Sequence, residues 1–464
     1  MESGFGLQVF EQIDKPNVFS WNTIIRCFAV SDDPQRALIG FQYYTKMLSQ
    51  ETFPDKYTFP FLLQACGSVS DSGLMKQVQC HIVKLGFDKD LFVQNSIINA
   101  CFKCGFLHDA RILFDEMVEK DVVSWTTLIS GLVTQGCHTE ALVVFGEMLE
   151  DDSENWPNVA TIVSVLTACG NLGSLDQAKC VHSLLQKGGW IHMDISVSNS
   201  LIDAYAKCGS LNSAAKVFED IGNDKRDLYT WTAMILALAI HGQGMDAYTL
   251  FCDMVRVSQI VPDSITFIAV LSACVHSGLV QEGLCIFESM KARYGIEPDL
   301  KHYGCIIDLL GKAGLLDRAY DIVEAMPMEP NLTILGSLLS ACRIHKNLDL
   351  VEIVLKKIKS LSGKSGGAPV LLSNIYANEN RWTEVIHIRK GIRTEVLEKP
   401  PGKSWIQVKD TVHKFVVGDK SHPEAMELCM LLEGLERLGK TLDGFTPSGN
   451  VVIEGQQPKC GPEF

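Results

Sequence analysis

The sequence lacks the features of a membrane protein. Among its 464 residues there is no run of about 20 apolar residues, the length that a membrane-spanning helix requires. Its N-terminus shows neither a signal peptide nor an amphipathic presequence rich in Arg and Ser, so no transit peptide is visible in this sequence. We therefore expect no contact with a membrane.

Motifs of common enzyme classes and an excess of positive charge are also absent. There is no phosphate-binding loop of the GxxxxGK type and no HExxH zinc motif. The formal net charge is -14, which taken alone argues against a nucleic-acid partner. Residues 351–420 nevertheless hold 13 Lys and Arg against 7 Asp and Glu. Any basic contact surface must therefore be local.

What the sequence does contain is a repeat of about 35 residues. Residues 195–227 read as two short amphipathic helices joined by a turn, in which Gly209 supplies the left-handed geometry that a helix end favours. One such pair cannot bury its apolar stripe alone, so neighbouring copies must stack. We predict an all-α fold, a right-handed α-solenoid of stacked helical hairpins.

Nine whole repeats follow a partial one. Residues 1–17 match only the second helix of a repeat, so we expect further sequence upstream, and whole repeats tile residues 18–331. Their predicted bounds are 18–55, 56–90, 91–121, 122–158, 159–194, 195–227, 228–263, 264–299 and 300–331. Positions within a repeat are numbered from these first residues.

The 16 cysteines follow this repeat rather than a disulfide framework. Four of them, Cys66, Cys169, Cys274 and Cys342, occupy the eleventh position of their own units. Free buried cysteine behaves as a small hydrophobic residue, and a reducing compartment is the expected home of such a chain.

The repeats alternate in type, and their motifs resemble one known family. The strings SWNTII, SWTTLISG, AYAKCG, ARILFDEM, DLLGKAGLLDRA, LLSACRIH and VLLSNIYA occur in the chain. They resemble the pentatricopeptide repeat family of plants, and within it the class of alternating long and short repeats (PLS). The resemblance covers nearly the whole chain to about residue 424.

The region after the repeats is divided by the same resemblance. Residues 332–400 are similar to the family's extension (E) domain of two degenerate helical hairpins, and residues 401–424 to its E+ box. In this box SWIQV and TVHKFVV alternate apolar and polar residues about Lys409–Asp410, which predicts a small β-hairpin. Residues 425–464 are expected to form a helix and a disordered tail.

The resemblance implies sequence-specific binding of single-stranded RNA, one base per repeat. It places the base-selecting side chains at the fifth and last positions. These pairs are Asn22 with Asp55, Asn95 with Asp121, Thr126 with Asn158, Asn199 with Asp227, and Thr232 with Asp263. In the family's code Asn/Asp implies uridine over cytidine, Thr/Asn adenine and Thr/Asp guanine. The predicted RNA string is Y-n-Y-A-n-Y-G-n-n, where Y is a pyrimidine.

Side chains at the second position could wedge between bases. They are Phe19, Tyr57, Phe92, Val123 and Tyr229. Apolar contact of this kind contributes roughly 1–3 kcal/mol per base. Two other interpretations compete here. Aromatic residues near a helix start often belong to the core, and Asn, Asp and Thr are natural helix caps.

Members of this class often end in a cytidine deaminase (DYW) domain, whose zinc site needs His-x-Glu followed by Cys-x-x-Cys. His138–Glu140 and His422–Glu424 match the first half, but no Cys-x-x-Cys follows either. The one Cys-x-x-Cys, Cys101–Cys104, falls within a repeat, where Cys101 aligns with Tyr205. We therefore predict no DYW domain, no enzyme activity, no cofactor and no metal site.

The sequence thus predicts a monomeric site-recognition factor for C-to-U editing of a transcript in the mitochondrion or chloroplast. A DYW-type deaminase or another editing protein would act in trans, recruited through residues 332–424. Two alternatives stay open. One is a factor for stability, splicing or translation of organellar RNA, and the other is a protein-binding helical-repeat scaffold.

Overall fold

The computed structural model describes most of the repeat region and parts of the C-terminal region. The described residues are 2–30, 33–69, 71–151, 156–188, 194–361, 373, 376–377, 382–383, 385–386, 388–389, 403–408, 411–416, 425–428 and 430–432. Contacts divide the chain into an N-terminal body, Met1–Ala204, and a C-terminal body, Tyr205–Phe464. Each body is described by itself.

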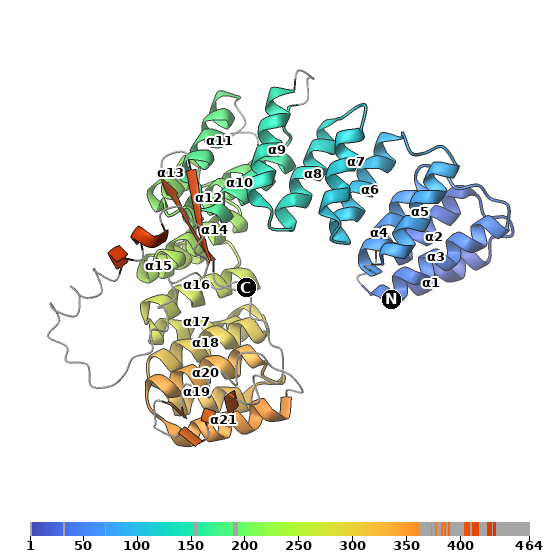
Figure 1. Cartoon of the computed structure of the whole chain (residues 1–464). Coiled ribbons are helices and arrows are strands. Elements are labelled where there is room, and N and C mark those ends of the chain that lie inside the picture. Colours follow the sequence, from blue (N-terminus) through green and yellow to red (C-terminus); the bar gives the residue numbers. More distant parts are fainter. Residues whose placement is uncertain are drawn as a thin grey trace. The chain divides into compact units, whose positions relative to one another are not determined.

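The N-terminal body is a stack of helical pairs, in which neighbours in sequence are neighbours in space (Figure 1). Its helices are α1 (Glu2–Glu11), α2 (Val18–Ala29), α3 (Pro34–Ser49), α4 (Thr58–Val69), α5 (Ser72–Lys84), α6 (Leu91–Lys103), α7 (Leu107–Glu116), α8 (Val122–Thr134), α9 (His138–Glu150), α10 (Val159–Leu172) and α11 (Leu175–Lys187). Helix α12 (Ile195–Lys207) crosses the boundary between the bodies.

The C-terminal body continues the same pattern. Its helices are α13 (Leu211–Asp220), α14 (Leu228–Ile240), α15 (Gly244–Arg256), α16 (Ser264–Ser277), α17 (Val280–Tyr294), α18 (Leu300–Lys312), α19 (Leu316–Ala325), α20 (Leu332–Ile344) and α21 (Leu348–Leu361). Helices α20 and α21 pack together as the first helical pair after the repeats. The stacked all-α architecture predicted from the sequence is confirmed.

The first helix of each repeat begins where the repeat pattern places it. This holds for every repeat except the second, in which α4 begins at Thr58, two residues after the predicted start. The cause is local, because Asp and Asn side chains at the ends of the repeats accept hydrogen bonds from the free N–H groups of the next helix.

The helices form two layers within each body. Consecutive first helices pack directly against each other, as α2 does with α4 and α16 with α18. Most second helices pack between the first helix of their own repeat and that of the next, as α9 does between α8 and α10. Each apolar stripe is therefore buried by the neighbouring repeat, as a solenoid requires.

Aromatic pairs recur at the seams between repeats. Trp21 and Trp125 are buried, and each meets a Phe of the preceding second helix edge to face, with ring centroids 4.9 Å from Phe10 and 4.8 Å from Phe114. The same contact recurs in the C-terminal body between Phe218 and Trp231, at 5.3 Å. Edge-to-face geometry is favourable for aromatic rings, and it explains the Trp that opens these repeats.

The recurring cysteines lie in the core. The four named above are buried thiols, as is Cys101, which also holds the eleventh position of its repeat, and burial raises the pKa of Cys66 and Cys274 to about 12. A thiol with so high a pKa stays protonated and unreactive at neutral pH. Cys101 and Tyr205, which align with each other, are both buried as well.

Two antiparallel strands lie where the sequence predicts a β-hairpin. Strands β1 (Lys403–Val408) and β2 (Thr411–Val416) pair with Val408 opposite Thr411. The turn residues 409–410, most of the second predicted E-domain hairpin and the predicted tail from residue 433 lie outside the described residues.

Two glycines about one helix predict opposite effects of the same added methyl group. Gly136, in the turn before α9, has φ +74°, whereas Gly146 lies within α9, where an added Cβ would meet open space. Gly136→Ala should destabilise the protein by about 1–2 kcal/mol, because a left-handed backbone disfavours Cβ. Gly146→Ala should stabilise it by roughly 0.5–1 kcal/mol. Thermal unfolding followed by circular dichroism measures both changes, and equal effects of the two would contradict the turn geometry.

Candidate nucleic-acid interface

Acidic side chains are distributed unequally between the two layers of helices. Within their described bounds, the ten first helices α2 to α20 contain only two acidic residues, Asp203 and Asp308, and six Lys or Arg residues. The eleven second helices α1 to α21 contain twenty acidic residues and fifteen Lys or Arg. The layer of first helices therefore does not share the acidity of the chain.

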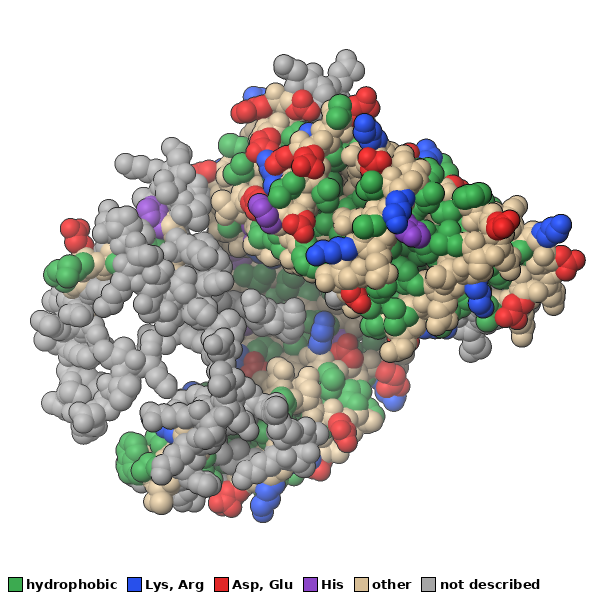
Figure 2. Space-filling view, turned by 45° about the vertical axis from the view of Figure 1, so that its right-hand side comes forward, with side chains coloured by type: hydrophobic (Ala, Val, Ile, Leu, Met, Phe, Trp, Pro, Cys, Tyr) green, Lys and Arg blue, Asp and Glu red, His purple; other side chains and the backbone are tan. Residues whose placement is uncertain are grey.

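On the face of the molecule in Figure 2, coloured acidic and basic side chains are interspersed with apolar ones. Several acids of the second helices are paired with bases. Arg111 on α7 donates to Glu147 on α9 at 2.9 Å and to Asp115 at 3.1 Å. Such pairs offset acidic charge on the layer that the candidate interface does not use.

Two of the three Asn residues predicted at the fifth position contact the last residue of the same repeat. Asn22 Nδ2 donates to Asp55 Oδ1 at 2.9 Å, and Asn95 Nδ2 donates to Asp121 Oδ1 at 3.5 Å. Both Asn side chains are only 7% exposed, because they lie at the seam where one first helix packs on the next. They are thus less open than a base-reading side chain is expected to be.

The Thr residues at the fifth position reach the last residue through one intermediate hydroxyl. Thr126 Oγ1 lies 2.7 Å from Thr161 Oγ1, which donates to Asn158 Oδ1 at 3.0 Å. Thr232 Oγ1 lies 2.8 Å from Thr266 Oγ1, which donates to Asp263 Oδ1 at 2.8 Å. The intermediate Thr is the third residue of the next helix, and no sequence pattern indicated this link.

Each last residue also caps the next helix, as the capping interpretation of these residues expects. Asp121, Asn158, Asp227 and Asp263 cap α8, α10, α14 and α16 through hydrogen bonds from the third backbone N–H. In Asp55, Asp121 and Asp263 the described bonds all end on Oδ1. The second carboxylate oxygen takes no part in capping.

Asn199 and Asp227 belong to different bodies. Asn199 is half-buried on α12, and Asp227 Oδ1 accepts from the hydroxyl of Thr230 at 2.8 Å. The local arrangement at Asp227 therefore matches that at Asp121 and Asp263.

The side chains at the second position point to solvent. Phe19, Tyr57, Phe92, Val123 and Tyr229 are between 50% and 78% exposed, so none of them belongs to the core. Tyr57 and Phe92, in consecutive repeats, have ring centroids 6.0 Å apart. Ile265 occupies the same position in its repeat and is 60% exposed, so it joins this set although the sequence reasoning passed it over.

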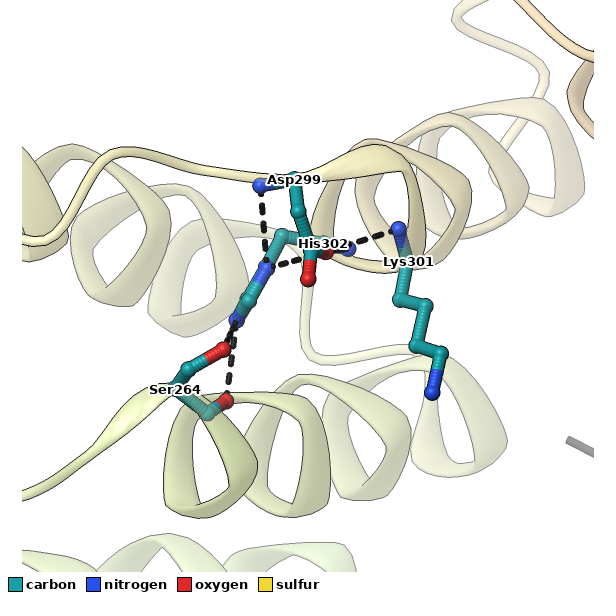
Figure 3. Close-up of polar contacts among 4 residues, drawn as sticks. All are labelled: Ser264, Asp299, Lys301 and His302. Atoms are coloured by element: carbon teal, nitrogen blue, oxygen red, sulfur yellow. Dashed lines mark hydrogen bonds and ion pairs between the residues drawn. The ribbon is translucent and has the colours of Figure 1, made fainter. Parts of the chain in front are cut away.

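The junction before α18 departs from the pattern (Figure 3). His302 replaces the usual Thr or Ser and is fully buried; its Nε2–H donates to the Ser264 carbonyl at 2.9 Å, and its Nδ1 lies 2.7 Å from Asp299 Oδ1. Partial burial opposes ionisation of Asp299, but the hydrogen bonds and charge of His302 outweigh it and lower the pKa of that carboxyl. The fifth residue here is Ile268, which makes no polar contact with the cap.

The described part of the chain holds no group of three or more His, Cys, Asp and Glu side chains placed to bind a metal ion. His138 opens α9, while His422 and Glu424 lie outside the described residues. Among the described helices, none has the length and apolar character needed to cross a membrane.

The buried hydroxyl of Thr58 at the first junction predicts a measurable stability difference. Thr58 is buried, donates to Asn22 Oδ1 at 2.7 Å and accepts from the Asp55 N–H at 3.1 Å. Thr58→Val should therefore cost about 1–3 kcal/mol, since both partners lose their bond without gaining water. Thr23→Val is the control, because that exposed hydroxyl bonds only to a carbonyl of its own helix, and its effect should stay within about 0.5 kcal/mol. Urea denaturation compares them; similar losses would contradict the bridging role.

Comparisons with known families agree with this architecture. The model of the PPR repeat matches residues 19–42, 95–122, 123–153, 196–224, 229–258 and 301–329. The model of the pentatricopeptide repeat domain matches residues 249–313, and that of the E motif matches residues 345–407.

Solved structures share the fold. The crystal structure of the maize pentatricopeptide repeat protein PPR10 superposes with a TM-score of 0.64 at 18% identity, covering 84% of this chain and 56% of that chain. PPR10 in complex with an 18-nt psaJ RNA element gives the same TM-score and identity, covering 83% of this chain and 57% of that one. The chain thus spans little more than half the length of PPR10.

Curated relatives come from Arabidopsis thaliana. A chloroplastic/mitochondrial pentatricopeptide repeat-containing protein is 40% identical over 455 residues, which cover 96% of this chain and 70% of the relative. A mitochondrial one is 38% identical over 454 residues, covering 97% of this chain and 70% of the relative. Together with the matched repeats, these similarities show that the chain belongs to the pentatricopeptide repeat family and carries an E motif after its repeats.

Proposed function

We propose that this protein binds single-stranded RNA along its layer of first helices and selects bases with the side chains at the repeat junctions. The observation that carries the proposal is the recurrence, in four of the nine repeats, of a fifth-position side chain linked to the capping residue of the next helix, either directly or through a hydroxyl. Within their bounds the first helices hold two acids against six Lys or Arg residues, and the Asp residues that precede them are engaged as helix caps, so the layer repels phosphates less than the second helices would. The related fold of PPR10 binds an RNA element, which supports the same use here.

The chemistry of the caps suggests how two purines are distinguished. Capping needs an acceptor, so Asn158 must use its oxygen and keeps its amide N–H groups for a ligand. Asp263 caps with Oδ1 and keeps Oδ2, an acceptor. Adenine presents the acceptor N1 at its pairing edge and guanine presents the donor N1–H. The Thr126/Asn158 junction therefore suits adenine, and Thr232/Asp263 suits guanine.

The Asn/Asp junctions suit uridine by the same reasoning. A second carboxylate oxygen can accept from uridine N3–H, whereas cytidine presents a lone pair at that atom. In Asn22 one amide proton is held by Asp55 and the amide oxygen by Thr58, which fixes the orientation of the amide. The remaining proton is then presented as a single donor to a base carbonyl.

We propose further that the protein marks a cytidine for conversion to uridine, and the E motif matched over residues 345–407 supports this role. A deaminase supplied in trans would be recruited through this C-terminal region. Two of the Arabidopsis relatives are named as chloroplastic/mitochondrial or mitochondrial, so we propose an organellar transcript as the target.

One substitution tests base selection directly. Asp263→Asn converts the Thr/Asp junction into the Thr/Asn junction that already exists at Thr126 and Asn158, and Asn caps a helix as well as Asp does. Binding to 9-mers of the predicted string should shift from guanine toward adenine at the seventh base. A bidentate or equivalent base contact is worth about 1–3 kcal/mol, so the preference ratio should change roughly ten-fold. Fluorescence anisotropy with the two RNAs measures it.

Asp90→Asn is the matched control. Asp90 caps α6 in the same way, but the fifth residue of its repeat is Pro60, which has no polar side-chain atom. This variant should leave the preference at every base unchanged. An unaltered seventh-base preference in Asp263→Asn, with the protein folded, would refute base selection by the junctions and favour a protein-binding scaffold.

The editing role has a separate test in vivo. Transcriptome sequencing of a knockout should show one or a few organellar cytidines that are no longer edited. In this class the last repeat conventionally lies over the fourth base upstream of the edited cytidine, so the predicted string should end there. Normal editing at every site, together with altered transcript abundance or splicing, would instead indicate another RNA function.

A further inference from the structure

Three repeats expose a large apolar residue immediately before the proline that precedes their last position. The segments are Phe53-Pro54-Asp55, Trp156-Pro157-Asn158 and Val261-Pro262-Asp263. Phe53, Trp156 and Val261 are 76%, 66% and 69% exposed, whereas the three prolines are buried. Neither the core nor the capping network uses these three side chains, which we call the pre-proline residues.

The backbone places each pre-proline residue on the side of its neighbouring capping residue. A residue before proline is held away from the helical region, and Asn158 and Asp263 themselves have extended backbone, with ψ of 176° and 179°. In an extended segment, side chains two residues apart point the same way and the one between them points the opposite way. The buried proline and the two outward neighbours follow this alternation.

We infer that the pre-proline residues are additional RNA-contacting platforms, against which the face of a base or ribose packs beside the selected nucleotide. This inference rests on the proposed function, since it uses the same RNA path. All three lie at junctions with a polar fifth residue: Asn22, Thr126 and Thr232. The corresponding residues before Pro298 and Pro330 are Glu297 and Glu329, at junctions whose fifth residues are Ile268 and Gly304. In the five repeats that have a proline before their last residue, the residue before that proline is therefore apolar where the fifth residue is polar and acidic where it is not; the repeats that end at Asp121 and Asp227 have no such proline.

Among the three pre-proline residues, Trp156 is expected to contribute most to RNA affinity. At the other two junctions the second position of the next helix is also large and exposed, as Tyr57 and Ile265 are. After Trp156 that position is Ala160, so the indole is the large apolar side chain that this junction offers to a ligand. Removing it should therefore weaken binding more than removing Phe53 or Val261 does.

The experiment measures RNA affinity of Trp156→Ala, Trp156→Phe and Trp382→Ala in the full chain, by anisotropy with the predicted 9-mer. Trp156→Ala should lose roughly ten- to a hundred-fold in affinity, as expected for one stacked base, while Trp156→Phe keeps a flat apolar face and should stay within about three-fold. Trp382 is also exposed but lies after the repeats, so its substitution should have no effect. RNA should also quench tryptophan fluorescence in the wild type more than in Trp156→Phe.

An abasic site in the RNA identifies the nucleotide. Removing the base at position four or five should weaken binding by the wild-type protein. Trp156→Ala and the wild-type protein should then bind this abasic RNA with equal affinity. Wild-type affinity of Trp156→Ala for intact RNA, while Asp263→Asn still shifts base preference, would overturn the platform and leave the proposed function standing. Failure of the wild-type protein to bind the predicted RNA at all would instead overturn the proposed function.

Discussion

The structure depends on one polar junction that is repeated along the chain. The start of every helix leaves backbone N–H groups without partners inside the helix, and each first helix needs a side chain to accept them. The residue that does so closes the preceding repeat and lies beside that repeat's fifth residue, directly in Asn22–Asp55 and through a hydroxyl in Thr126–Asn158. Helix capping therefore fixes the spacing and orientation of the side chains that are proposed to meet bases.

The division of charge between the layers removes an apparent conflict. A chain with a net charge of -14 is a poor candidate for binding phosphates when its charge is taken as uniform. The acids are concentrated on the second helices, where Arg111 and other bases pair with some of them. The first helices themselves hold only two acids, so the carboxylates at the proposed interface are mainly those of the capping Asp residues, which accept hydrogen bonds from the helix N–H groups.

A residue can recur along a repeat protein because it packs in the core or because it contacts a ligand, and its burial distinguishes the two cases. Trp21, Trp125 and Cys66 recur because each seam between repeats needs the same packing, and all three are inside. Phe19 and Tyr229 recur at the second position but are exposed, so packing does not explain them. Exposed apolar side chains that return at this position in six of the nine repeats are a better indication of a ligand than any single one would be.

The sequence by itself determined nearly all starts of the first helices, the turn at Gly209 and the position of the two C-terminal strands. These features are local: they follow from periodicity, capping residues and glycine at a helix end, each read within a few residues. Only α4 began later than predicted. Tertiary structure decided the rest, including the burial of Asn22 and the relay from Thr126 through Thr161. Those contacts join residues about one repeat apart, and they exist only because consecutive first helices pack side by side.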